Sequence, residues 1–256
     1  MNMKNKYTEA LEARGVDAEL IYYDITDSTN TRARELARGR SERGPVILVA
    51  EEQSAGRGRR GRSFFSGRGA GLYVSFLLYP EDRGADVTSM TAFAAVALRR
   101  AIARLTGLRA DIKWVNDLYA DGKKLAGILA EGEMGADGKM TALAVGMGIN
   151  IYKTAYPEEI SDIATSIENA CGKRVDRAEL LAELALEMLR ADRSESAVLE
   201  EYREASFLIG REVTVHTASG SYPARAVELS PDFSLIVERE DGERLRLFTG
   251  EVSVKI

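Results

Sequence analysis

The chain contains few of the residues that many enzymes use for catalysis or metal binding. Among 256 residues there is one cysteine, Cys171, and one histidine, His216. A single cysteine excludes an internal disulfide and fits a reducing compartment, so we expect a cytoplasmic protein. Zinc sites of the usual Cys/His type need several such ligands. A lone histidine in the strand-like stretch "EVTVHTA" also argues against a Ser-His-Asp or Cys-His mechanism. The chemistry therefore has to proceed without a histidine base.

Long apolar runs and an excess of basic residues are also missing. No stretch approaches the roughly 20 apolar residues that a membrane-spanning helix needs. The start, "MNMKNKYTEALEARG", lacks the apolar segment of a secretory signal. The formal net charge of -5 argues against a general nucleic-acid binder. With 45% hydrophobic and 29% charged residues, the composition is that of a globular protein with one large domain, or a large and a small one.

Hydrophobic periodicity and turn signals predict an α+β protein. The predicted helices cover residues 1–20, a segment that begins close to Ser28, 86–105 with an end at Gly107, about 176–191, and about 194–205. Strands are predicted at 21–26, in "GPVILVAEEQ", in "GLYVSFLLYP" and around the hairpin turn Asp121-Gly122, with a second turn at "GADG". After Phe207 short alternating segments predict a small all-β unit. We therefore expect two domains, 1–206 and 207–256.

The stretch "GRGRRGR", from Gly56 to Arg62, is the strongest local concentration of charge. It holds four arginines and three glycines, and no acidic residue occurs between Gln53 and Tyr79. Glycines let several backbone N–H groups approach one anion, and arginine offers bidentate donors that suit phosphate or carboxylate. The Gly-x-Gly-x-x-Gly pattern is shared with dinucleotide-binding folds, but "RSFFSGRGAG" after it indicates more loop than helix. Alone, this loop fits either an anion site or an arginine-rich surface turn.

A second polar cluster lies in "KWVNDLYADGKKLAGIL", on short strands around a turn. Burying the Asn116-Asp117 pair beside an apolar strand would be costly without partners, although such a pair can also form a simple turn. Lys124 is followed at once by the apolar residues "LAGIL" and could reach into a cleft as a fixed positive charge. Its neighbour Lys123 fits a solvated hairpin lysine better.

These two clusters, in this order, resemble the biotin protein ligases, which join biotin to a lysine of a carrier domain with ATP. The resemblance runs from about Tyr22 to the C-terminus and rests on "DSTN" (27–30), "EEQSAGRGRRGRSFFS" (51–66), "KWVNDLYADGKKLAGIL" (113–129) and "GMGIN" (146–150). It implies a catalytic domain with a mixed sheet similar to class II synthetases, followed by an SH3-like β-barrel. Some members also carry an N-terminal DNA-binding domain. Because 26 residues precede "DSTN", we expect the short form, without a DNA partner.

The resemblance also implies which residues form the site. The family's biotin contacts fall on Ser28, Thr29, Asn30, Gln53, Arg57, Gly58, Arg59, Lys124 and Gly127. Its ATP contacts fall on Gly56, Arg59, Arg60, Gly61, Arg62, Asn116 and Lys124. Lys124, Arg57 and Arg59 are the predicted catalytic residues. No protein ligand is assigned to the Mg²⁺ that would bridge the phosphates.

Three positions depart from the family pattern. Phe64 stands where tryptophan is frequent, which preserves an aromatic wall. Val115 replaces a frequent proline, and Lys255 stands where some relatives carry arginine, so no nucleotide contact is assigned to it.

The implied reaction has two steps and is a protein biotinylation, a post-translational modification. Biotin's carboxylate attacks the α-phosphorus of ATP, which forms biotinyl-5'-AMP and releases pyrophosphate. A lysine of a biotin carboxyl carrier protein then attacks the mixed anhydride, so the second nucleophile belongs to the partner. Fixed cations can hold the two anions together without a base. A lipoate ligase with the same acyl-adenylate chemistry and a nucleic-acid-binding module remain alternatives, and the sequence leaves open whether the protein is a monomer or a homodimer.

Overall fold

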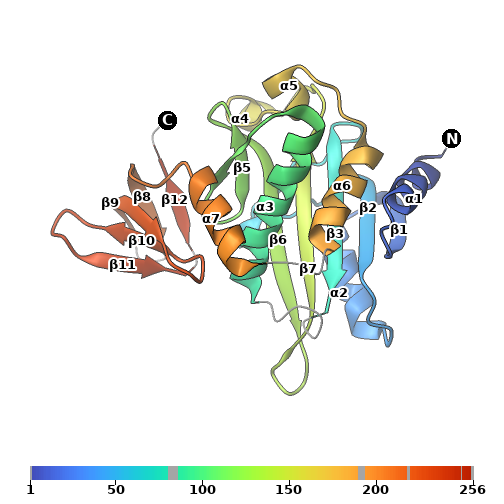
Figure 1. The fold of residues 1–256 in the computed structure, drawn as a ribbon, viewed down its shortest axis with the longest axis horizontal. Helices are drawn as coiled ribbons and strands as arrows, with labels where there is room; N and C mark the ends of the chain where they lie inside the picture. The colour runs from blue at the N-terminus through green and yellow to red at the C-terminus, as the bar shows by residue number, and fades with distance from the viewer. Residues whose placement is uncertain (1, 80–85, 190–193, 218–219, 249, 255–256) are drawn as a thin grey trace.

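The computed structural model describes residues 2–79, 86–189, 194–217, 220–248 and 250–254 (Figure 1). Seven strands form one mixed sheet in the order β1-β2-β3-β7-β6-β5-β4. β1 and β2 pair in parallel, and the other neighbours in this sheet pair antiparallel. The strands are β1 (Glu19–Thr26), β2 (Val46–Gln53), β3 (Gly71–Leu78), β4 (Asp111–Lys113), β5 (Asp117–Ala120), β6 (Lys123–Met134) and β7 (Met140–Asn150).

Helices cover both faces of this sheet (Figure 1). Successive strand residues point to opposite faces, so β3, which is buried along its whole length, contributes to two cores. Phe76 belongs to the large core beneath four helices, and Leu77 belongs to the small core beneath α2 (Thr29–Gly39). The four helices are α1 (Met3–Ala13), α3 (Val87–Thr106), α6 (Arg177–Leu189) and α7 (Glu195–Ala205). The N-terminus of α2 is therefore held against the face of the sheet that carries the site described below.

Local signals explain several element boundaries. α3 begins at Asp86, whose carboxylate accepts hydrogen bonds from the backbone N–H of Thr88 and Ser89, and ends at Gly107 with φ +80°. The predicted hairpin turn joins β5 to β6, and both of its residues have positive φ, 50° at Asp121 and 73° at Gly122. These predictions are confirmed.

Other boundaries differ from the sequence-based prediction. α1 ends at Ala13, and the chain enters β1 at Glu19, so the predicted helix over residues 1–20 is too long. The polar turn at Gly15, with φ +64°, separates the two elements. Two short helices, α4 (Glu158–Ser161) and α5 (Ile167–Cys171), were not predicted, because four or five residues are too few to show a helical period.

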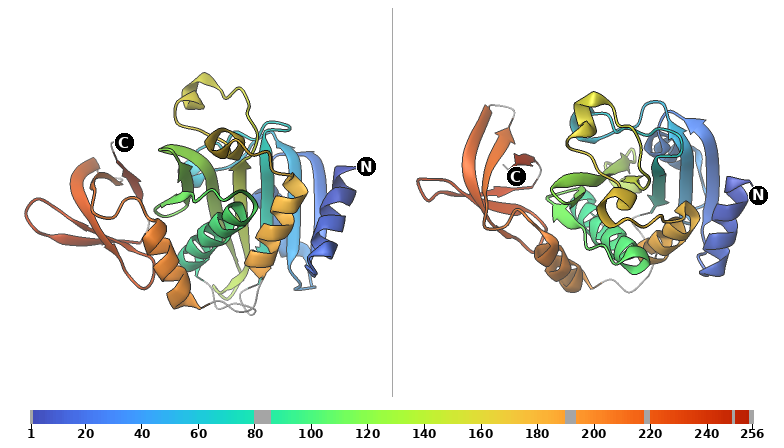
Figure 2. Two further views of the ribbon diagram at one scale, coloured as in Figure 1. Left: turned by 45° about the horizontal axis from the view of Figure 1, so that its top comes forward. Right: turned by 90° about the horizontal axis from the view of Figure 1, so that it is seen from above.

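The C-terminal residues form a second, antiparallel sheet at one end of the molecule, beside α7 and far from α1 (Figure 2). Its order is β11-β10-β9-β8-β12. The strands are β8 (Glu212–Thr217), β9 (Gly220–Leu229), β10 (Leu235–Glu238), β11 (Arg244–Leu247) and β12 (Glu251–Ser253). The predicted all-β unit is confirmed. Within the described residues β11 and β12 are the two edges of an open sheet, so closure into a barrel is not confirmed.

Specific contacts join the two sheets. The Trp114 Nε1–H donates to the backbone oxygen of Phe233 at 2.8 Å, and the ring of Phe233 packs edge-on against Tyr202 of α7, with 5.8 Å between centroids. Arg203 Nε donates to the backbone oxygen of Leu229 at 3.1 Å. The apolar core runs without interruption from α3 into the second sheet. The division at residue 206 stays a prediction.

Candidate functional site

A cavity of about 330 Å³ opens where α2 begins, between the arginine loop and the strands β6 and β7. It gathers segments that lie far apart in the sequence. The predicted site residues that line it are Ser28, Thr29, Asn30, Gln53, Arg57, Gly58, Arg59, Arg60, Arg62, Asn116, Lys124 and Gly127. Gly56 and Gly61 are not among the lining residues. The structure thus brings together most of the predicted residues, while their individual roles stay predictions.

The arginine loop is a small hairpin that closes one side of the cavity. The N–H of Gly58 donates to Arg62 O at 2.7 Å, and the N–H of Phe64 donates to Gly56 O at 2.8 Å. Between them Arg59–Gly61 form a tight turn in which Arg60 and Gly61 have positive φ, 55° and 74°, which matches the predicted loop rather than the helix of a dinucleotide-binding fold. A Cβ at Gly56 would lie under 3.0 Å from Phe64 O and Ser66 Oγ, so this glycine serves the close packing of the hairpin.

One end of the cavity is polar but uncharged, and it is deeply buried. Thr29 and Asn30 are each 3% exposed. The backbone N–H of Thr29 donates to Gln53 Oε1 at 2.8 Å, and Gln53 Nε2 donates to Ser66 Oγ at 2.8 Å. Asn30 Nδ2 donates to Leu129 O at 3.1 Å. These bonds fix the carboxamide groups, which suits recognition of a neutral polar ligand.

The other end carries fixed positive charge. Lys124 Nζ lies 2.8 Å from Asp117 Oδ2 and 6.0 Å from the centroid of the Phe64 ring. Arg59 Nη1 donates to Asn116 Oδ1 at 3.0 Å, and its Nη2 donates to Gly250 O at 3.1 Å. Asn116 is therefore partnered, and Asp117 is paired through Oδ2, which lowers the cost of placing these groups beside an apolar strand, while Asp117 Oδ1 has no hydrogen-bond partner among the described residues.

The backbone of Lys124 is held by the segment Ile163–Thr165, which no sequence signal places beside it. Its N–H donates to Ile163 O at 2.7 Å, and its carbonyl oxygen accepts from Thr165 N at 2.9 Å. This short parallel bridge aligns the start of β6 with the chain after α4. As a result the Lys124 side chain leaves a backbone that is fixed on both sides.

Two glycines of the "GMGIN" stretch, Gly146 and Gly148 of β7, line the cavity. A Cβ at Gly146 would lie under 3.0 Å from the Asn30 carboxamide, and a Cβ at Gly148 would lie under 3.0 Å from the Phe64 ring. Any side chain at these positions would displace the group above it. The stretch was noticed in the sequence, but its residues were given no role, and their purpose depends on contacts across about 80 to 120 residues of chain.

The prediction also missed most of the remaining cavity wall. Asp117 and Trp114 were visible inside a recognised motif, and Phe64 was expected as an aromatic wall. Nothing in the sequence marks the chain after β7 or the start of β12 as parts of the site. The lining residues without a predicted role include Phe65, Lys113, Trp114, Asp117, Tyr119, Ile128, Leu129, Met147, Asn150, Tyr156, Ile160, Ile163, Ala164, Gly250 and Val252. Lys255 lies outside the described residues.

The described part of the chain holds neither a cluster of metal-ligating side chains nor a membrane-spanning helix. There, no group of three or more His, Cys, Asp or Glu side chains could hold a metal ion. None of the described helices combines the length and apolar character that crossing a membrane requires.

Residues 22–150, half of the chain, match the model of the Biotin/lipoate A/B protein ligase family, and the chain belongs to this family. The bifunctional ligase/repressor BirA of Bacillus subtilis is 30% identical over 251 residues, which cover 95% of this chain and 76% of that protein. A biotin–[acetyl-CoA-carboxylase] ligase of Paracoccus denitrificans is 38% identical over 167 residues, 62% of this chain and 67% of that protein.

Solved structures agree with these relatives. The biotin protein ligase from Aquifex aeolicus in complex with biotin and ATP has a TM-score of 0.78 at 30% identity and covers 93% of this chain and 98% of that chain. Within the family, the chain groups with the biotin protein ligases.

Proposed function

We propose that this protein activates biotin with ATP as biotinyl-5'-AMP and transfers the biotinyl group to a specific lysine of a biotin carboxyl carrier protein or domain. The observation that carries the proposal is the polarity of the cavity, with a buried uncharged end at Thr29 and Asn30 and a cationic end at Lys124. Biotin has the same two ends, because an aliphatic chain joins its neutral ureido ring system to a carboxylate. Membership of the family supports the same assignment.

In the first step the protein has to hold two anions together. The carboxylate of biotin is already a nucleophile at neutral pH, and its attack on the α-phosphorus of ATP needs no base from the protein. Lys124 lies at the cationic end of the cavity, where Arg59 is held in place by Asn116. Fixed cations of this kind stabilise charge at phosphorus without having to reorganise during the reaction.

Mg²⁺ would arrive with the triphosphate. The cavity offers it one carboxylate, Asp117, whose Oδ1 is buried and has no hydrogen-bond partner among the described residues. One or two protein carboxylates plus phosphate oxygens are typical of magnesium that accompanies ATP. When bound, the ion supplies neutralisation of phosphate charge. The carrier supplies the lysine that attacks in the second step, so this protein needs no nucleophile of its own.

We further propose that residues 1–206 are the catalytic domain, related to the class II synthetases, and that 207–256 are an SH3-like domain. Support comes from the separate antiparallel sheet and from Gly250 and Val252, which bring its last strand to the cavity. The cytoplasmic location and the choice between monomer and homodimer stay predictions.

ATP–pyrophosphate exchange tests the first step directly. We expect exchange that depends on biotin and is absent without an acid. Exchange with lipoate alone would keep the chemistry and overturn the substrate, and no exchange with either would overturn the ligase assignment. For the second step, an added biotin carboxyl carrier domain should become labelled on one lysine, and a carrier with that lysine replaced should not.

A further inference from the structure

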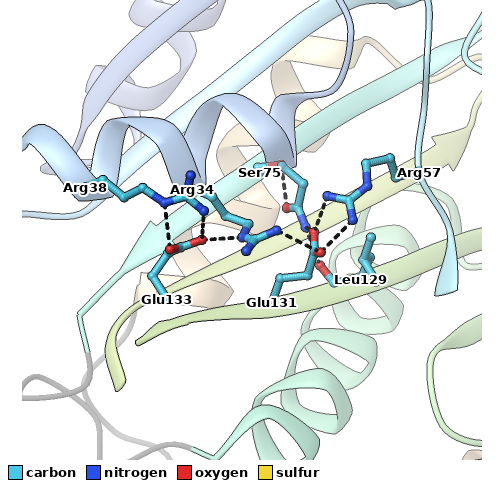
Figure 3. A network of polar contacts seen from close by, with 8 residues as sticks. Arg34, Arg38, Arg57, Ser75, Leu129, Glu131 and Glu133 are labelled. Carbon is cyan, nitrogen blue, oxygen red and sulfur yellow. Dashed lines mark hydrogen bonds and ion pairs between the residues drawn. The ribbon is translucent and has the colours of Figure 1, made fainter. Parts of the chain in front are cut away.

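A carboxylate that no motif predicted joins Asn30, at the buried end of the cavity, to Arg57 of the arginine loop. Glu131 lies on β6, two residues after Leu129, and its side chain is 18% exposed. Its oxygens accept hydrogen bonds from Asn30 at the buried end and from Arg57 of the arginine loop (Figure 3). Glu131 itself is not among the residues that line the cavity. It binds Asn30 and Arg57, two residues predicted to contact biotin, from outside the cavity.

The contact with Asn30 fixes which way its carboxamide points. Nδ2 donates to Glu131 Oε2 at 2.8 Å and to Leu129 O at 3.1 Å, so both of its N–H groups are used. Oδ1 accepts from Ser75 Oγ at 3.0 Å and has a second lone pair left. An ionised carboxylate only accepts hydrogen bonds, and a reversed carboxamide would therefore set oxygen against oxygen. Asn30 is thus locked as an acceptor toward the cavity.

Arg57 and Glu131 form a bidentate ion pair. Nη1 donates to Glu131 Oε2 at 3.0 Å and Nη2 donates to Oε1 at 2.9 Å. The Arg57 side chain is 41% exposed on a glycine-rich hairpin, so without a partner it would sample many rotamers. Two parallel charge-assisted hydrogen bonds select one position for the guanidinium.

Two arginines of α2, Arg34 and Arg38, bind Glu131 and Glu133. Arg34 Nη1 donates to Glu131 Oε1 at 3.3 Å, and Arg34 Nε donates to Glu133. Arg38 donates to both oxygens of Glu133, at 2.9 and 3.0 Å (Figure 3). These hydrogen bonds from Arg38 lower the pKa of the Glu133 carboxyl. Glu133 belongs to the same network, but no hydrogen bond or ion pair among the described residues joins it to Asn30 or Arg57.

We infer that Glu131 is a positioning residue for biotin, which acts by orienting Asn30 and Arg57 together. The inference rests on the proposed function. The single charge of Glu131 orients both side chains. Asn30 and Arg57 therefore already have their binding positions before the ligand enters.

The test compares Glu131→Gln with Glu133→Gln, a matched change two residues along the same strand. Exchange is measured against biotin at saturating ATP and against ATP at saturating biotin, and thermal unfolding is recorded for each variant. We expect Glu131→Gln to raise the half-saturating biotin concentration about tenfold or more and to change that of ATP by less than about twofold. Glu133→Gln should leave both concentrations within about twofold, although it disturbs as many arginine hydrogen bonds as Glu131→Gln and should unfold at a similar temperature.

If Glu131 had only a structural role, the half-saturating biotin concentration would rise in proportion to the loss of thermal stability in both variants. That result would overturn the inference, as would a biotin response of Glu131→Gln that is unchanged or tighter than that of the unmodified protein. If Glu131→Gln does not fold, Glu131→Asp keeps the charge but withdraws it by one methylene, and it should raise the biotin requirement in the same direction. Failure of the unmodified protein to show biotin-dependent exchange would refute the proposed function itself and is distinct from these outcomes.

Discussion

Replacing Lys124 by alanine removes a cation from the charged end of the cavity. Its Nζ lies 2.8 Å from Asp117 Oδ2, and the side chains of Lys124 and Asp117 are 31% and 18% exposed. Loss of one preorganised group that stabilises transition-state charge reduces kcat by about 10²–10³. The Asp117 carboxylate would also stay behind unpaired. At about 4 Å and an effective dielectric constant of about 20, a charge pair interacts by about 4 kcal/mol, so this carboxylate would repel the incoming anions.

We therefore expect Lys124→Ala to lower biotin-dependent exchange by at least about 10²-fold. The free energy of unfolding should change by only about 1 kcal/mol, because the ion pair is partly solvated. Lys123→Ala is the control, since Lys123 is exposed on the same hairpin, and it should leave exchange unchanged. Exchange by Lys124→Ala within about threefold of the unmodified protein, with unaltered folding, would refute the reasoning.

Three further predictions follow from the packing and the charges. Gly148→Ala places a Cβ under 3.0 Å from the Phe64 ring, and we expect the half-saturating biotin concentration in the exchange assay to rise about tenfold; an unchanged concentration would contradict this. Glu183→Ala leaves Arg14, which follows α1, and Arg104 of α3 without their fully buried partner and should lower the free energy of unfolding in urea by about 3 kcal/mol. Hydrogen bonds from Arg32 lower the pKa of Asp27 to about 2, so Asp27 stabilises the fold above its ordinary pKa of 3.8 and loses this effect as the pH falls toward about 2. Asp27→Asn should therefore cost about 1 kcal/mol at neutral pH, after allowance for a side chain that is 38% exposed, and urea midpoints of the two proteins should converge below about pH 3.8.

Local chemistry made part of this structure predictable. The Asp121-Gly122 turn demands positive φ at two adjacent residues, which its residue types tolerate, and Gly107 ends α3 for a related reason. The arginine loop was recognisable because charge and glycine are concentrated within seven residues. Each of these signals lies within a few positions of the feature that it sets.

Long-range pairing explains what was missed. Glu131 reads as one polar residue in a strand, and its partner Asn30 is 101 residues away. The chain at Ile163 belongs to the site because its backbone bonds to Lys124, and no side chain in that segment signals such a bond. Whether the second sheet closes depends on the pairing of its edge strands, which alternation of apolar residues does not determine.

The position of the one tryptophan gives this protein a built-in spectroscopic probe. Trp114 is 3% exposed, lines the cavity and donates its indole N–H to a backbone oxygen of the second sheet. Indole emission is sensitive to that hydrogen bond and to nearby water, so tryptophan fluorescence of the unlabelled chain reports from the boundary between the two sheets. An emission shift on adding biotin, ATP or carrier would report a change in the surroundings of Trp114 at this boundary.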